Sequence, residues 1–163
     1  MSTLPPIAIT PGDPCGIGPE IIARAFLIDA LLPQAMPVTQ ACFVAGDERV
    51  MQKAINLIDP QARHLKLQVI QKPTQALNVP VGVIPVLQVA TLATELPYGK
   101  IHAEAGRFAG QCVVWAAQAA LRKDIAAMVT APLHKEALSA AGSPFNQFPG
   151  HTELLQFEAA QFS

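Results

Sequence analysis

Residues 7–27 read IAITPGDPCGIGPEIIARAFL, a short apolar strand followed by a loop and the start of a helix. Three prolines and three glycines within residues 11–20 give the loop a largely preset path. Pro19 suits the first helical position, and Glu20 complements the positive end of the helix dipole. The stretch predicts a strand-to-helix unit whose loop lies at the carboxyl end of a strand, where open α/β sheets bind ligands.

This loop matches no nucleotide-binding fingerprint. The pair Gly16-x-Gly18 lacks a third glycine at Ile21, and no Gly-Lys-Ser or Gly-Lys-Thr follows. Asp13 has two interpretations: it approaches a ligand, or it holds its own loop through a side-chain-to-backbone hydrogen bond. Cys15 is either a thiol with a lowered pKa or a small bystander in the loop.

Strand and helix patterns alternate along the rest of the chain, which predicts an α/β fold with a mostly parallel sheet. Asp47 is a plausible N-cap, Pro85 marks an edge or irregular strand, and the apolar run at residues 125–130 indicates a central strand. The predicted strands are Ile7–Thr10, Gln40–Gly46, Leu65–Gln71, Val83–Leu87 and Ile125–Thr130, and the predicted helices are Pro19–Leu31, Asp47–Ile58, Ala103–Lys123, Lys135–Ala141 and one that follows Thr152.

The segment FNQFPGHTELL, residues 145–155, places a Pro-Gly turn, a histidine and a hydroxyl before a helical run. Thr152 is expected to cap that helix, with Glu153 in its first turn and His151 on its rim. A helix start with free N–H groups suits an anionic substrate. The alternative is a capped helix with an incidental histidine before it.

His134 and Lys135 follow the strand at residues 125–130, at its carboxyl end, where anion contacts are common. They serve either such contacts or only the start of the next helix. His64 and His102 flank predicted elements and are expected to face solvent.

The long helix at residues 103–123 carries small residues on two faces. This pattern permits close packing on both sides, either within the core or at a dimer contact.

Composition narrows the class of protein. The chain has 163 residues, a net charge of −1, 51% hydrophobic and 14% charged residues. This charge gives no reason to expect nucleic acid or an anionic membrane surface as a partner. Three widely spaced cysteines favour a reduced protein, and the sequence shows neither a signal peptide nor an apolar run long enough to span a bilayer. We therefore expect a cytoplasmic location.

Three motifs in register resemble one family. The sequences TPGDPCGIGPE at residues 10–20, TAPLHK at residues 130–135 and GHTE at residues 150–153 are similar to those of the 4-hydroxythreonine-4-phosphate dehydrogenases of pyridoxal phosphate biosynthesis. The resemblance implies an isocitrate/isopropylmalate-dehydrogenase-like fold of two α/β lobes, with an active site completed by the second subunit of a homodimer.

The resemblance also implies a chemistry. Members oxidise 4-phosphooxy-L-threonine with NAD and a divalent metal (Zn, Mg or Co), and loss of CO2 then gives 3-amino-2-oxopropyl phosphate. Substrate contact carries over to His151 and Thr152, with Asp13, His134 and Lys135 as candidate active-site loop residues. The family's metal ligands are expected beyond Ser163, so none of the histidines here is assigned to a metal.

The helical pattern at the end of the chain stops without a glycine cap or a following strand. We expect residues 1–163 to form the N-terminal part of a two-lobed dehydrogenase, without its C-terminal lobe and inactive alone. Two alternatives stay open: a paralogue acting on another phosphorylated four-carbon acid or a cyclic diol acid, and a non-catalytic remnant lobe.

Overall fold

A five-stranded parallel sheet forms the centre of the protein. The computed structural model describes residues 4–32 and 37–162. The strand order is β3-β4-β2-β1-β5, and every neighbouring pair is parallel. The strands are β1 (Ile7–Thr10), β2 (Cys42–Gly46), β3 (Lys66–Ile70), β4 (Val83–Gln88) and β5 (Ala127–Thr130). The predicted α/β lobe with a parallel sheet is confirmed.

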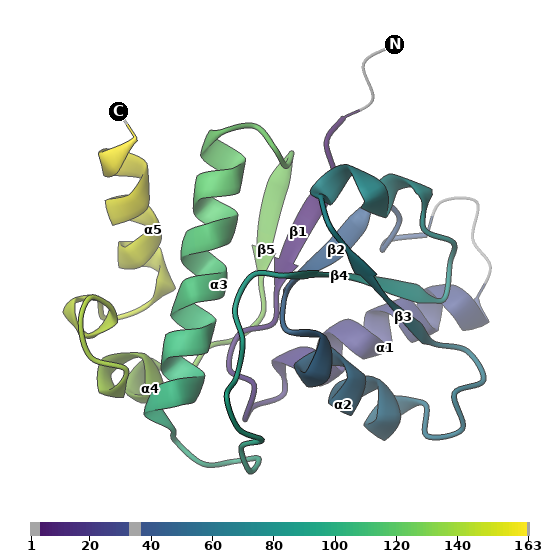
Figure 1. The fold of residues 1–163 in the computed structure, drawn as a ribbon, viewed down its shortest axis with the longest axis horizontal. Helices are drawn as coiled ribbons and strands as arrows, with labels where there is room; N and C mark the ends of the chain where they lie inside the picture. Colours follow the sequence, from purple (N-terminus) through teal and green to yellow (C-terminus); the bar gives the residue numbers. More distant parts are fainter. Residues whose placement is uncertain (1–3, 33–36, 163) are drawn as a thin grey trace.

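Helices cover both faces of the sheet (Figure 1). On one face, α1 (Gly18–Leu31) and α2 (Glu48–Ile58) bury Phe26, Met51 and Ile55 against β2 and β4. On the other face, α3 (Ala103–Leu121) lies over β1 and β2, next to Phe43. Connections between parallel strands require such crossovers, so both faces of the central strands are buried.

A further layer packs on the outer side of α3. It contains α4 (Lys135–Ala140) and α5 (His151–Gln161), joined by the 3-10 helix η2 (Phe145–Gln147). Another 3-10 helix, η1 (Pro73–Asn78), lies outside this layer, between β3 and β4. A Cβ built on Gly106 would lie 1.9 Å from the Ala137 carbonyl oxygen, so only glycine allows α3 and α4 to approach this closely. The two small-residue faces of α3 are therefore buried within this chain, which corrects the dimer-contact alternative.

The sequence predicted the positions of two strands within the sheet wrongly. β5 pairs with β1 and with no other described strand, so it lies at an edge, and Val129 is 52% exposed. The apolar run at residues 125–130 indicated a central strand because Ile125 is buried, but Ile125 precedes β5 and packs under α3.

The opposite correction applies to β4, which was predicted to be an edge or irregular strand; the edge alternative is wrong. It lies between β3 and β2, although Pro85 lacks a backbone N–H. Its pairing with β2 begins at Val86, directly after the proline. Pro85 therefore lies outside the part of β4 that pairs with β2.

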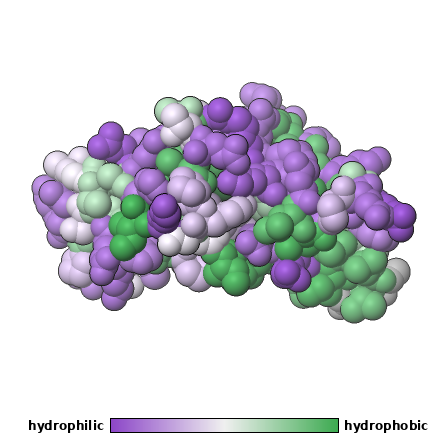
Figure 2. All heavy atoms as spheres, turned by 90° about the horizontal axis from the view of Figure 1, so that it is seen from below, coloured by the Kyte–Doolittle hydropathy of each residue, from purple (hydrophilic) through white to green (hydrophobic). Residues whose placement is uncertain are grey.

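Apolar side chains remain exposed on α1. Ile21, Ile28 and Leu31 are between 45% and 50% exposed. Figure 2 views the molecule from the side of α1 and α2 and shows apolar surface gathered at the lower right. A contiguous apolar area of this kind is typical of a contact surface. None of the described helices is long and apolar enough to cross a membrane.

Candidate active site

Three of the candidate residues, Asp13, His134 and Lys135, follow the adjacent strands β1 and β5 at their carboxyl ends. Thr10 and Thr130 pair in register, so the loops that follow the two strands leave the sheet side by side. The first loop carries Asp13, and the second leads through Pro132 to His134. The carboxyl edge of a parallel sheet is where ligands of α/β folds bind.

The loop after β1 is bonded to the loop after β5. The Asp13 backbone N–H donates to the Pro132 carbonyl oxygen at 3.0 Å. Gly12 has a φ of +68°, and a Cβ there would lie 2.2 Å from the same carbonyl oxygen. Only glycine permits this approach. The glycine that the sequence places before Asp13 thus joins two parts of the site.

Asp13 holds its own loop. It is only 7% exposed, and its Oδ1 accepts the backbone N–H of Cys15 at 2.8 Å. This hydrogen bond supports the second of the two interpretations of Asp13, in which its side chain holds its own loop. Burial and the neighbouring Asp13 raise the pKa of the Cys15 thiol to about 11, so the alternative of a lowered pKa is wrong.

The loop after β5 ends at α4. His134 is the N-cap residue of α4 and makes no side-chain capping bond. His134 and Lys135 are both exposed, as are the adjacent Pro132 and Glu136. Their side chains are accessible to a ligand in solution, which leaves both of their predicted roles open.

The start of α5 differs from the sequence-based prediction. Gly150, with extended φ and ψ of −171° and −170°, is the N-cap residue, and no side chain caps the helix. Thr152 is the second residue of the helix and is exposed, so it does not cap α5. The helix begins two residues earlier than the capping rule suggested, because Gly150 rather than Thr152 occupies the N-cap position. Glu153 lies in the first turn, as predicted.

The first turn of α5 offers hydrogen-bond donors to a ligand. A helix begins with N–H groups that have no partner within the helix, and here no side-chain oxygen replaces that partner. His151 is half-buried beside these groups, and the Thr152 hydroxyl is exposed. Such a turn favours an anion through both hydrogen bonding and the helix dipole.

Lys135, the first residue of α4, lies close to the start of α5. A Cβ built on Gly150 would lie 3.7 Å from Lys135 Cε and 3.6 Å from Glu153 Oε2. The structure therefore places the cation of Lys135 next to the first turn of α5. No side-chain bond joins Asp13 to His134, Lys135, His151 or Thr152 across the described residues, so Asp13 acts on the site only through its own loop and the backbone bond to Pro132.

Two further predictions concern the other histidines. His64 is exposed, as expected. His102 precedes α3, and its Nε2 is buried without a hydrogen-bond partner, so the prediction that His102 faces solvent is wrong for this atom. No three or more His, Cys, Asp or Glu side chains converge to hold a metal within residues 4–32 and 37–162.

Sequence reasoning missed a crevice on the same edge of the sheet. It lies between α2 and the segment after β4 and is lined by Arg49, Lys53 and Tyr98 among others. A usable signal was present: the polar residues that follow the predicted cap Asp47 recur on one helical face.

The chain is similar to known proteins over most of its length. Residues 38–162 match the family described as the pyridoxal phosphate biosynthetic protein PdxA. A 4-hydroxythreonine-4-phosphate dehydrogenase of Trichlorobacter lovleyi is 41% identical over 152 residues, which are 93% of this chain and 42% of that protein. A D-threonate 4-phosphate dehydrogenase of Salmonella typhimurium is 41% identical over 150 residues, again 42% of its length.

The fold agrees with this similarity. The crystal structure of 4-hydroxythreonine-4-phosphate dehydrogenase from Klebsiella pneumoniae superposes with a TM-score of 0.78 at 34% identity, covering 96% of this chain and 45% of that one. The chain thus spans less than half the length of these relatives. On the sequence match and the shared fold, this chain belongs to the PdxA family of pyridoxal phosphate biosynthetic proteins.

Proposed function

We propose that the protein contributes the substrate-anion site of an NAD- and divalent-metal-dependent dehydrogenase that acts on a phosphorylated four-carbon hydroxy acid. The observation that carries the proposal is the first turn of α5, where His151 and Thr152 follow a glycine cap and Lys135 lies alongside. Family membership supports the reaction class, because the similar proteins are named as dehydrogenases of such phosphates.

The substrate we favour is 4-phosphooxy-L-threonine, oxidised with decarboxylation to 3-amino-2-oxopropyl phosphate in pyridoxal phosphate biosynthesis. The second candidate is D-threonate 4-phosphate, which the Salmonella typhimurium relative is named for. Both compounds carry a phosphate and a carboxylate on a four-carbon chain and differ in the group at C2. The anion contacts proposed here suit both substrates.

The roles of this chain's residues follow from their positions. The free N–H groups of the first turn of α5 and the Thr152 hydroxyl donate hydrogen bonds to an anionic group of the substrate. His151 adds a ring N–H from the half-buried side, and Lys135 adds a positive charge. Asp13 fixes the conformation of the loop after β1, and its backbone N–H bonds this loop to Pro132 in the loop after β5.

When bound, NAD would supply a hydride acceptor for the proposed reaction, and a divalent metal would supply a Lewis acid. Within residues 4–32 and 37–162, no group of His, Cys, Asp or Glu side chains could hold this metal, so we assign it no ligand in this chain. We further propose a cytoplasmic homodimer. The exposed apolar side chains of α1 offer surface for such a contact.

Binding to this chain tests the proposed site directly. The protein has four histidines, so histidine ring signals in NMR spectra can be assigned one by one. Added 4-phosphooxy-L-threonine should shift the His151 signal saturably and leave that of exposed His64 in place. A His151 signal that does not move, or that moves no more than the His64 signal, refutes the site.

Activity tests the reaction. Residues 1–163 can be joined to the remaining part of the Trichlorobacter lovleyi relative, and NADH formation followed with each of the two phosphates as substrate. Faster turnover of 4-phosphooxy-L-threonine supports the favoured substrate, and faster turnover of D-threonate 4-phosphate supports the second. If the fusion binds both phosphates and oxidises neither while the parent relative is active, the proposed dehydrogenase role is wrong.

A further inference from the structure

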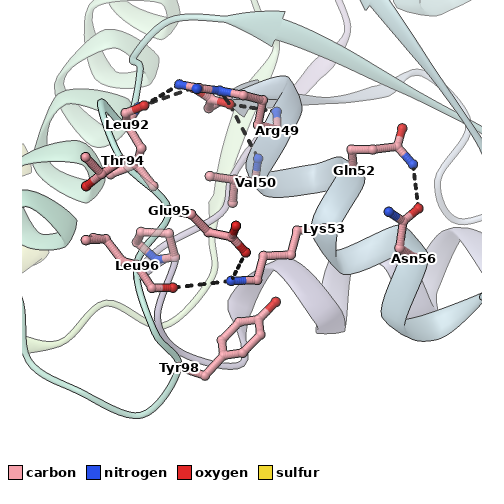
Figure 3. A pocket seen from close by; sticks show the side chains of 12 residues that line it. Arg49, Val50, Gln52, Lys53, Asn56, Leu92, Thr94, Glu95, Leu96 and Tyr98 are labelled. Carbon is pink, nitrogen blue, oxygen red and sulfur yellow. Dashed lines mark hydrogen bonds and ion pairs between the residues drawn. The ribbon is translucent and has the colours of Figure 1, made fainter.

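A crevice of about 430 Å³ opens between α2 and the segment that follows β4 (Figure 3). Its volume lies within the range of small-molecule sites. One wall is the polar face of α2, and the other is formed by Leu92, Leu96 and Tyr98. Pro14, the neighbour of Asp13 in the loop after β1, borders the crevice, but Asp13, His134, Lys135, His151 and Thr152 do not line it.

The position of the crevice in the sheet is one that favours ligands. β2 and β4 are neighbours, and the chain leaves β2 for α2 on one face but leaves β4 for α3 on the other. Adjacent parallel strands whose connections diverge in this way leave a crevice at their carboxyl ends. The crevice is therefore a product of the topology.

The α2 wall presents four polar side chains in one row. Arg49, Gln52, Lys53 and Asn56 follow the spacing of a single helical face, and Figure 3 shows them along the side of the crevice. Gln52 Nε2 donates to Asn56 Oδ1 at 2.8 Å, which leaves the Gln52 carbonyl and the Asn56 amide available. Arg49 is bonded to the Leu92 carbonyl oxygen, and its side chain is 62% exposed.

Lys53 already binds a carboxylate within this crevice. Its Nζ lies 2.9 Å from Glu95 Oε1, donates to the Leu96 carbonyl oxygen at 3.2 Å and lies 4.2 Å from the centre of the Tyr98 ring. The hydrogen bond with Glu95 raises the pKa of Lys53, and the same bond lowers the pKa of Glu95, so both groups are charged at neutral pH.

Glu95 is a weakly held occupant. Its side chain is 79% exposed, and the bond to Lys53 is the one polar contact of its carboxylate within the described residues. Exposed ion pairs contribute little to stability, so an external anion can replace this carboxylate at low cost. The buried carboxylate of Asp47 does not oppose that exchange, because it accepts from Arg49 N, Val50 N, Leu92 N and Gln88 Nε2.

We propose that this crevice is a binding site for a small organic anion, whose phosphate or carboxylate replaces that of Glu95 on Lys53. The apolar part of the ligand lies against Val50, Leu92 and Leu96, and Arg49 supplies a second cation. The proposal does not depend on the dehydrogenase function, because it uses other residues.

The single tyrosine of the chain makes the test simple. With labelled tyrosine, the only ring signals are those of Tyr98, which lines the crevice. The probes are phenyl phosphate, phenylacetate, inorganic phosphate and, as a neutral control, benzyl alcohol, all at constant ionic strength. We expect saturable shifts with phenyl phosphate or phenylacetate, and the tighter of the two identifies the preferred anionic group.

Variants separate the proposal from a nonspecific effect. Glu95→Gln removes the internal competitor and should tighten binding about threefold. Lys53→Met should weaken it at least about tenfold, and Lys53→Arg should restore most of it. Lys66→Met, at an exposed position of β3, should bind like the parent and controls for lost net charge.

Any one of four results overturns the proposal. The first is that the Tyr98 signals stay in place with both organic anions up to about 50 mM. The dissociation constant would then be weaker than one charge-assisted hydrogen bond gives. The second is that benzyl alcohol shifts the Tyr98 signals as much as phenyl phosphate does. The third is that Glu95→Gln binds no more tightly than the parent, and the fourth is that Lys53→Met binds as tightly.

Discussion

Asp47 binds Leu92 across 45 residues of sequence: Oδ2 of the carboxylate accepts the backbone N–H of Leu92 at 3.3 Å. The other oxygen, Oδ1, accepts the backbone N–H groups of Arg49 and Val50 at 2.7 and 3.4 Å and caps α2. One buried side chain therefore starts a helix and fastens the long segment after β4 to it.

Replacing Asp47 should destabilise the fold strongly. We expect Asp47→Ala to lower the free energy of unfolding by about 2–4 kcal/mol, because it removes a helix cap and leaves the Leu92 N–H without its acceptor. Urea unfolding followed by circular dichroism measures this. Asp124→Ala removes only an exposed partner of Arg122 and should cost less than about 1 kcal/mol. Equal urea midpoints for the two variants would contradict the double role of Asp47.

Gly106→Ala should disrupt the layer formed by α4 and α5. The new Cβ would meet the Ala137 carbonyl oxygen at 1.9 Å, and backbone cannot move aside as a flexible side chain can. Overpacking of this kind costs roughly 1–3 kcal/mol or more. Gly16→Ala, whose Cβ would find its nearest neighbour at 3.5 Å, is the matched control. If both variants melt at the temperature of the parent, α3 and α4 do not pack as described.

The three thiols should react slowly in the native protein. Cys15, Cys42 and Cys112 are at most 7% exposed, and burial raises the pKa of each thiol, that of Cys15 to about 11. At pH 8 only about one Cys15 in a thousand is a thiolate. A thiol reagent should release its chromophore over hours in buffer and within seconds in urea. One thiol that reacts at once in buffer would refute the described burial.

Asp59 should make stability depend on pH in the acid range. Hydrogen bonds from the backbone N–H groups of His64 and Leu65 lower the pKa of Asp59 below its ordinary value of 3.8. A lowered pKa means that the folded state favours the carboxylate, so the stabilisation is complete above the unfolded pKa. It is lost as pH falls through the folded pKa.

The comparison with Asp59→Asn isolates this effect. The difference in urea midpoint between parent and variant should stay constant above about pH 5 and shrink towards pH 2. A difference that is the same at every pH would show that the charge of Asp59 contributes nothing.

His151→Ala should impair substrate use more than folding. In a longer enzyme that carries residues 1–163, we expect kcat/KM to fall about ten- to a hundredfold through loss of a hydrogen bond to a charged substrate group. Thr152→Val should act in the same direction with little change in melting temperature, because Thr152 is exposed and does not cap α5. His64→Ala, also exposed, should leave both quantities unchanged. A His151→Ala enzyme that melts early but retains full kcat/KM would make the residue structural.

Local chemistry allowed most of the elements to be predicted. The strand-to-helix loop after β1, the Asp47 cap and the Ala-rich α3 all follow from nearest neighbours in sequence. The Asp47 cap is confirmed, α1 begins one residue before the predicted Pro19, and α3 ends two residues before the predicted Lys123. Thr152 shows the limit of this approach. The capping rule ranks residues by how well their side chains cap a helix, and it therefore favoured Thr152. In the structure the N-cap residue is Gly150, which has no side chain and an extended backbone.

Strand order depends on partners far along the chain. Pro85 suggested an edge, but the pairing of β4 with β2 begins one residue later, and the apolar run before Thr130 belongs partly to the turn below α3. The crevice beside α2 was missed for the same reason. The polar face of α2 was visible in the sequence, but the far wall comes from residues more than forty positions away, and no local pattern indicates that the two walls meet.

The pairing of β1 with β5 has a consequence for how the chain is made. Ile7 lies beside Ala127, so one side of the first strand finds its neighbour only after a further 120 residues have left the ribosome. Until then β1 has β2 as its partner, while its other edge is open to pairing with any passing chain. Parallel pairing over such a separation is slow, because a long loop must close first. The nascent protein therefore risks aggregation through β1 until β5 has emerged, and chaperone contact with the early strands should persist until α3 and β5 emerge.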